Sequence, residues 1–140
     1  MNNKLILQEM DFRLHYCDTD AVGIVYYAAY YPWFERVFTE WTFENGIPFE
    51  VWEEKFNALQ VAVASGCNYR KPALVLDPFT VRMRSGNLGV SSYRMDFSVD
   101  HRETNETYAD GHMTFACIRS KENPESVPVP SELAALLKES

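Results

Sequence analysis

Apolar and polar side chains alternate over residues 10–16, close to the N-terminus. An alternation with a period of two is typical of a strand that buries one of its faces. We therefore expect a strand here that leads directly into Cys17 and Asp18.

A different pattern follows, in which bulky apolar residues recur at helical spacing from Trp33 to Trp41. Pro32 suits the first turn of a helix, and Asn45-Gly46 is a typical helix end. We predict one long helix between these two signals, preceded by an irregular helical segment over residues 21–30. Its broad apolar stripe favours a helix that is wrapped by a sheet.

The later part of the chain changes to runs rich in valine and aromatic residues, which predict strands. Alternation within these runs favours an antiparallel sheet with one covered face. The expected strands are residues 59–69, 79–84, 92–102 and 108–119, with turns at Lys71-Pro72, Asp77-Pro78, Gly86-Asn87 and Thr104-Asn105, and short helices are expected over residues 49–55 and after Ser131.

Together these elements predict an α+β fold in which one long central helix is wrapped by an antiparallel β-sheet. We expect a single domain over residues 1–140, because the sequence shows no repeat and no linker. The open edges of such a sheet are commonly covered by a second copy of the chain. A homodimer formed through the sheet edge is therefore expected.

Net charge and hydropathy narrow the classes of function. The formal net charge is −7, which argues against nucleic acid as a main partner because phosphate contacts need clustered Lys and Arg. Residues 1–13 lack the uninterrupted apolar core expected of a signal peptide, and no later run approaches the roughly 18 apolar residues that a transmembrane helix needs. We predict a soluble, cytoplasmic protein without a membrane partner.

The cysteines and histidines do not form the pattern of a metal site. Cys17, Cys67 and Cys117 are far apart without a CxxC pair, and the three histidines are equally scattered. A structural zinc site needs four such ligands with short spacings between them. We therefore expect reduced thiols, no metal and no cofactor.

The candidate chemistry lies between the first strand and the long helix, where Asp18, Asp20 and Gly23 occur together. Unpaired N–H groups at a helix start can polarise a carbonyl oxygen. A carboxylate close by can attack the carbonyl carbon or activate a water. The alternative is that both aspartates only cap the turn, since Asp is favoured in such positions.

The run DTDAVGIVYYAAYYPWFER, residues 18–36, resembles the motif of hotdog-fold acyl-CoA thioesterases of the 4-hydroxybenzoyl-CoA thioesterase family. The matching positions are Asp18, Asp20, Gly23, Val25, Tyr27, Tyr30 and Glu35. The segment over residues 69–73 is also similar to that family. The resemblance implies the hotdog fold.

The resemblance further implies that Asp20 is catalytic, as a nucleophile or as a general base toward water. It implies that the backbone N–H of Tyr27 binds the thioester oxygen, and that Asp18 has a structural role. Many relatives have His where this chain has Tyr27, so proton transfer by an imidazole is not available here and the reaction depends more on Asp20.

Substrate contacts are expected at the motif and at two further places. Ser65 lies in a small polar break of its strand that either borders the acyl pocket across the dimer interface or marks a bulge. Ser91 and Ser92 are candidates for bonds to a phosphate or to the pantetheine arm. The full expected set is Gly23, Ile24, Val25, Tyr30, Ser65, Ser91 and Ser92, with positive charge available from Arg70, Lys71, Arg82 and Arg84.

The function implied is hydrolysis of an acyl-CoA or acyl-carrier-protein thioester to the free acid and the thiol. The aromatic cluster over residues 26–34 favours an aromatic or short acyl group. The family often forms a dimer of dimers. Two alternatives stay open, a non-catalytic dimer that binds acyl thioesters and a hotdog hydratase or dehydratase, although the latter needs a His paired with an acid.

Overall fold

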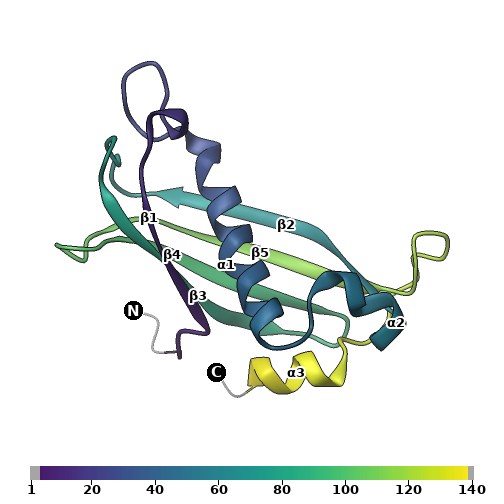
Figure 1. Ribbon diagram of the computed structural model, residues 1–140. Helices are drawn as coiled ribbons and strands as arrows, with labels where there is room; N and C mark the ends of the chain where they lie inside the picture. The colour runs from purple at the N-terminus through teal and green to yellow at the C-terminus, as the bar shows by residue number, and fades with distance from the viewer. Residues whose placement is uncertain (1–3, 139–140) are drawn as a thin grey trace.

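One long helix, α1 (Tyr30–Glu44), packs across one face of a five-stranded antiparallel sheet with strand order β1-β3-β4-β5-β2 (Figure 1). The computed structural model describes residues 4–138. The strands are β1 (Gln8–Arg13), β2 (Leu59–Tyr69), β3 (Pro78–Leu88), β4 (Ser92–His101) and β5 (Thr107–Ile118). The shorter elements are the 3-10 turns Tyr16–Asp18, Tyr27–Ala29 and Phe49–Val51 and the helices α2 (Trp52–Phe56) and α3 (Ser131–Lys138). This arrangement confirms the predicted α+β fold.

The first strand ends earlier than its alternating pattern predicts. β1 stops at Arg13, and Leu14 leaves the ladder with β3. The N–H of Leu14 donates to Asp77 O at 3.0 Å, and its carbonyl accepts from Leu76 N–H at 2.7 Å. The expected strand that leads directly into Cys17 is therefore wrong, because Cys17 itself lies in a 3-10 turn.

The turn between β3 and β4 also lies later than predicted. Gly86 and Asn87 belong to β3, at an irregularity in its pairing with β4 between Ser85 and Leu88. The chain reverses after this point, where Gly89 N–H donates to Ser92 O at 2.8 Å. The expected turn at Gly86-Asn87 is wrong, because the ladder continues past the glycine through this irregularity.

The inner face of the sheet and the apolar stripe of α1 form the core. The buried helix residues include Trp33, Phe34, Val37, Phe38 and Trp41, as the spacing predicts. Phe34 stacks on Phe97 of β4 with ring centroids 4.6 Å apart. A Cβ at Gly111 would lie 2.5 Å from the Phe34 ring, so a residue without a side chain lets the first half of α1 lie close to β5.

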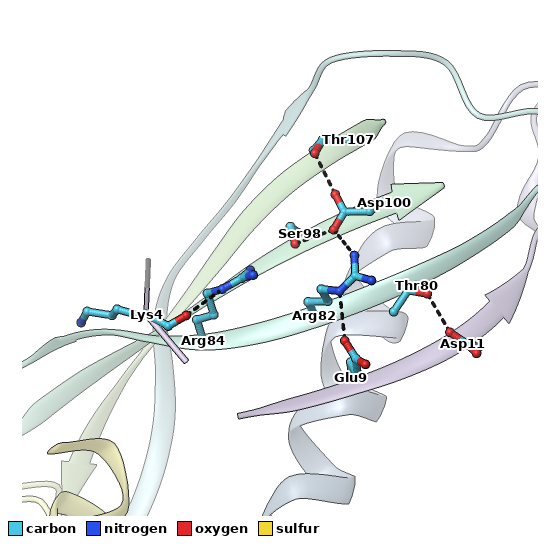
Figure 2. Close-up of polar contacts among 9 residues, drawn as sticks. All are labelled: Lys4, Glu9, Asp11, Thr80, Arg82, Arg84, Ser98, Asp100 and Thr107. Carbon is cyan, nitrogen blue, oxygen red and sulfur yellow. Dashed lines mark hydrogen bonds and ion pairs between the residues drawn. The ribbon is translucent and has the colours of Figure 1, made fainter. Parts of the chain in front are cut away.

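The opposite face of the sheet carries a network of polar side chains (Figure 2). Arg82 of β3 bonds Glu9 of β1 at 3.0 Å and Asp100 of β4 at 2.7 Å. Asp100 also accepts from Ser98 at 3.0 Å and from Thr107 at 2.7 Å. This cluster, called here the Asp100 network, links β1, β3 and β4 to the start of β5.

β2 is an edge strand with an apolar surface. It pairs with β5 alone among the described strands, and Val61 and Val63 are 40% and 59% exposed. A bulge lies between Ala62 and Ala64, whereas the pairing with β5 continues in regular register from Ser65 to Tyr69. The bulge considered at Ser65 therefore lies at Val63 instead.

Candidate active site

A tight loop over residues 19–25 holds Asp20 in front of α1, and Asp18 lies just before this loop. Thr19 and Val25 form an antiparallel bridge, and Asp20 N–H donates to Ile24 O at 2.8 Å. Gly23 has a φ of +82°, a conformation that side chains other than glycine rarely adopt. Gly23 therefore allows the backbone to reverse its direction. The loop needs no side chain at this position for packing.

The same loop is fixed to the segment between β2 and β3. Val25 N–H donates to Ala73 O at 3.0 Å, and Ile24 bridges to Leu74. In Figure 1 the loop extends beyond one end of the sheet, beside the start of α1. The sequence thus brings residues fifty positions apart to one end of the molecule.

The Asp20 carboxylate is held by backbone N–H groups through one of its oxygens. Oδ1 accepts from Val22 N–H at 2.9 Å and from Ile24 N–H at 3.3 Å. No partner of Oδ2 lies within residues 4–138, and the side chain is exposed. Such an arrangement fixes the carboxylate and leaves lone pairs for a water or a carbonyl carbon.

Asp18 is occupied in a different way. Its Oδ2 accepts from His15 N–H at 3.0 Å, and its Oδ1 lies 3.8 Å from Cys17 Sγ. Its carbonyl accepts from Tyr26 N–H at 2.7 Å. These contacts cap the 3-10 turn Tyr16–Asp18, as expected of a structural partner.

Tyr27 opens a short 3-10 turn that runs without interruption into α1. The first N–H groups of a helical segment have no acceptor within it, and the described residues provide no partner for Tyr27 N–H. The carbonyl of Tyr27 accepts from the hydroxyl of Tyr69 at 2.7 Å. Tyr69 lies at the end of β2 and was missed as a site residue from sequence.

A cavity of about 290 Å³ lies beside this turn. Ile24, Val25, Tyr27 and Tyr30 line it together with residues 69–72. Four predicted site residues therefore meet at one cavity. Tyr30 is only 1% exposed, and burial raises its pKa well above the ordinary value, so it forms part of the floor as a neutral phenol.

The structure keeps the three predicted serines away from this cavity within one chain. Ser65 is an exposed residue in the middle of β2. Ser91 and Ser92 follow the far end of β3. A strand rises roughly 3.3 Å per residue, so the far end of β3 lies about 33 Å from Pro78. A role for them requires a second copy of the chain or an extended ligand.

The basic residues expected to supply positive charge are mostly neutralised. Arg70 pairs with Asp110, and Lys71 pairs with Glu106. Arg82 belongs to the Asp100 network. Arg84 donates to Lys4 O at 3.2 Å and has no carboxylate within 4.0 Å among the described residues.

A larger cavity of about 610 Å³ lies on the other side of the helix start, facing β1. It is lined by Phe12, Arg13, His15, Cys17, Asp18, Tyr26, Ala28, Ala29, Pro32, Trp33 and Arg36. The alternation of residues 10–16 gave no sign of this cavity, because it assigned His15 to a strand. Asp20 lines neither this cavity nor the 290 Å³ one, and Tyr27 lines only the latter.

Within residues 4–138, no three side chains of His, Cys, Asp or Glu gather in a way that could hold a metal ion. The described helices include none long and apolar enough to span a bilayer.

Comparison with known proteins decides the family. The sequence profile of the thioesterase-like superfamily matches residues 13–137. The chain belongs to the thioesterase-like superfamily. As a member of this superfamily it is a thioester hydrolase, and the match covers the motif and the strands β2 to β5.

Individual relatives agree with this assignment to the superfamily. A protein of Aquifex aeolicus (strain VF5), named only provisionally as an esterase, is 26% identical over 128 residues, which cover 91% of this chain and 94% of that protein. A 1,4-dihydroxy-2-naphthoyl-CoA thioesterase from Synechocystis superposes with a TM-score of 0.84 at 15% identity, covering 94% of this chain and 96% of that one.

A gentisyl-coenzyme A thioesterase superposes with a TM-score of 0.75 at 24% identity, covering 93% of this chain and 98% of that one. At such identities the superpositions establish the fold. The helix and the antiparallel sheet of this superfamily member form a hotdog fold.

Proposed function

We propose that this thioesterase hydrolyses an acyl-CoA at the cavity beside Tyr27 and that Asp20 is its catalytic carboxylate. One observation carries the proposal: the loop holds Asp20 through Oδ1 alone, next to the start of α1. Ile24 both donates to Asp20 and lines the cavity. The carboxylate is thereby linked to the place where an acyl group would lie.

The chemistry needs no further group. An Asp is ionised near neutral pH, and a thioester is an activated acyl compound. Either Oδ2 attacks the thioester carbon, so that the thiolate of CoA leaves and water then hydrolyses the mixed anhydride, or Asp20 takes a proton from the attacking water. The N–H of Tyr27 stabilises the negative charge that develops on the carbonyl oxygen.

The positions of the histidines favour hydrolysis over hydration or dehydration. His15 lines the larger cavity, and His101 accepts the N–H groups of Glu103 and Thr104 at 3.0 and 3.3 Å within its own turn. His112 lies against Gly66 in the sheet. A hydratase needs a histidine paired with an acid at the acyl thioester, and the 290 Å³ cavity has none among its described lining residues.

The acyl group that the site suits best is aromatic or short. The rings of Tyr30 and Tyr69, which both line the cavity, lie 5.7 Å apart, and the ring of Tyr27 lies 4.5 Å from that of Tyr26, which lines the larger cavity. Such clusters favour stacking with an aromatic acyl group. The names of the two structural neighbours, naphthoyl-CoA and gentisyl-CoA thioesterases, also describe aromatic thioesters.

The test is a panel of aryl, short-chain and long-chain acyl thioesters, each on CoA and on an acyl carrier protein, with a thiol-trapping reagent, run on the native protein and on Asp20→Asn. We expect turnover of aryl or short acyl-CoAs that Asp20→Asn lacks. Undiminished turnover by Asp20→Asn would remove Asp20 from the mechanism. Saturable acyl-CoA binding without turnover would favour the non-catalytic dimer, and turnover of only carrier-protein thioesters would exclude CoA as the carrier.

We also propose a homodimer that pairs the β2 edges of two copies, since this edge is apolar and open. Val63→Lys places a charge at the bulge of that edge and is expected to give monomers in light scattering. Val90→Lys, at a turn residue that is 82% exposed, is the matched control and should stay dimeric. A dimeric Val63→Lys protein would exclude this edge. Association of dimers into tetramers and a cytoplasmic location stay predictions.

A further inference from the structure

The hydrogen bond from Tyr69 to Tyr27 joins the edge strand β2 to the first residue of the helical segment. The hydroxyl of Tyr69 lies 2.7 Å from the carbonyl oxygen of Tyr27, and the two residues are 42 positions apart in the chain. The bond therefore connects the end of β2 to the start of the helical segment, which are far apart in the sequence.

Tyr69 is held in place by its contacts with the sheet and with Tyr30. Its backbone pairs with Ala109 of β5, and the next residue, Arg70, donates its N–H to Tyr108 O at 2.8 Å. Its ring lies against the buried ring of Tyr30. The phenol is thus held both by the sheet and by the first turn of α1.

The bonded residue, Tyr27, is the one whose N–H is free to bind the thioester oxygen in the proposed function. A hydroxyl bonded to the Tyr27 carbonyl restricts rotation of the peptide that follows this N–H. A donor that is already oriented needs no rearrangement when the oxyanion forms. Small misplacements of such groups lower the rate more than they lower binding.

We propose that Tyr69 is a positioning residue, whose hydroxyl fixes the Tyr27 backbone so that its N–H points at the thioester oxygen. This inference rests on the proposed function. Tyr69 acts through Tyr27 and takes no part in the bonds that form or break.

The surroundings keep Tyr69 in the state that this role needs. Burial, followed by the neighbouring Cys67 and Tyr31, raises the pKa of Tyr69 above its ordinary value of 10.0. The phenol therefore stays protonated and can donate through the neutral range. The nearby Cys67 is a thiol as well, because burial raises its pKa to about 11.

Tyr69→Phe removes the hydroxyl and retains the ring. We expect kcat on the best acyl-CoA to fall about tenfold, because the Tyr27 N–H is then less well oriented toward the oxyanion, while KM stays within twofold. Tyr93→Phe is the matched control, since the hydroxyl of Tyr93 bonds Gln60 away from the cavity, and it should retain kcat. An unchanged kcat, or a change confined to KM, would overturn the positioning role.

Amide hydrogen exchange at residues 27–31 gives a readout that does not need turnover. We expect faster exchange there in Tyr69→Phe than in the native protein and Tyr93→Phe, and equal exchange would overturn the inference. If the native protein hydrolyses none of the panel, the proposed function fails by itself. The exchange result then still decides whether Tyr69 holds the turn.

Discussion

Asp20 and Asp100 are both aspartates on this fold, but their surroundings are opposite. Asp100 is 7% exposed, and both of its oxygens accept hydrogen bonds from other side chains. Asp20 is exposed, and from residues 4–138 it receives only backbone N–H groups, all on one oxygen. A carboxylate whose partners saturate it stabilises the fold, whereas a fixed carboxylate with a free oxygen is suited to chemistry.

The difference follows from the elements that carry the two residues. Asp100 projects from β4 among Arg82, Ser98 and Thr107, where neighbouring strands present side chains on one face (Figure 2). Asp20 lies in a loop whose backbone turns back on itself, so its nearest donors belong to the main chain. The sheet supplies stability and the loop supplies an available acid.

The largest expected effect that tests this contrast is on catalysis. Asp20→Asn should lower kcat by roughly 10³, which corresponds to about 4 kcal/mol of transition-state stabilisation. The melting temperature should change little, because an amide oxygen can still accept from Val22 and Ile24. Steady-state kinetics and thermal melts on one preparation check both. A large loss of stability would show that Asp20 is mainly a turn residue.

The second prediction is a loss of stability without a loss of kcat. Asp100→Asn leaves Arg82 without a buried counter-charge, and we expect a loss of about 2–3 kcal/mol in the free energy of unfolding. The folded protein should retain its kcat, since Asp100 lies in the Asp100 network on the face of the sheet opposite α1. Urea titration gives the first quantity. A variant of native stability would mean that the Asp100 network contributes nothing net.

A smaller effect concerns one member of the same network. Thr107 Oγ1 donates to Asp100 Oδ1 at 2.7 Å, and Thr107→Val removes this bond while keeping the shape. We expect a loss of about 1 kcal/mol in urea titration. Thr107→Ser retains the hydroxyl and is the control. Equal losses in both variants would assign the effect to packing.

The smallest expected effect concerns the solvent exposure of a cysteine beside Asp18 and of a cysteine in the sheet. Cys17 lies exposed beside Asp18, whereas Cys117 of β5 is 0% exposed and burial raises its pKa to about 11. At pH 8 a thiol reagent should label Cys17 quickly and the other cysteines slowly. Cys17→Ser should abolish the fast phase. Fast labelling of Cys117 would show that the sheet opens readily.

The raised pKa of the Cys117 thiol also fixes the sign of a pH effect. The folded state binds this proton more tightly than the unfolded chain, whose thiol has a pKa near 9.0. The stability that Cys117 contributes is therefore complete below pH 9 and is lost as pH rises toward 11. Urea titration at pH 8 and pH 10.5 should give the lower stability at the higher pH.

Sequence patterns predicted helices and strands correctly where one pattern of apolar residues continued through the whole segment. The stripe from Trp33 to Trp41 and the strand over residues 59–69 agree with the structure, since burial on one face decides both. The end of β1 and the turn after β3 could not be predicted in this way. Their positions depend on bonds to segments far along the chain, such as Leu14 with Asp77.

The candidate site was predictable in part for the same reason. Ile24, Val25, Tyr27 and Tyr30, which the motif names, line one cavity because they are close in sequence. Tyr69 was missed, since its role depends on the sheet bringing the end of β2 to the helix start. The ion pairs of Arg70 and Lys71 could not be predicted from sequence, because their carboxylate partners lie in β5 and in the turn before it.

The exposed edge of β2 has a consequence for the newly made chain. Its free N–H and C=O groups and the apolar Val61 and Val63 can pair with any strand they meet, including one of a partly folded neighbour. The chance of a wrong partner rises with concentration and lasts until the edge is covered. Overproduction at low temperature should therefore yield more usable protein than fast, warm expression.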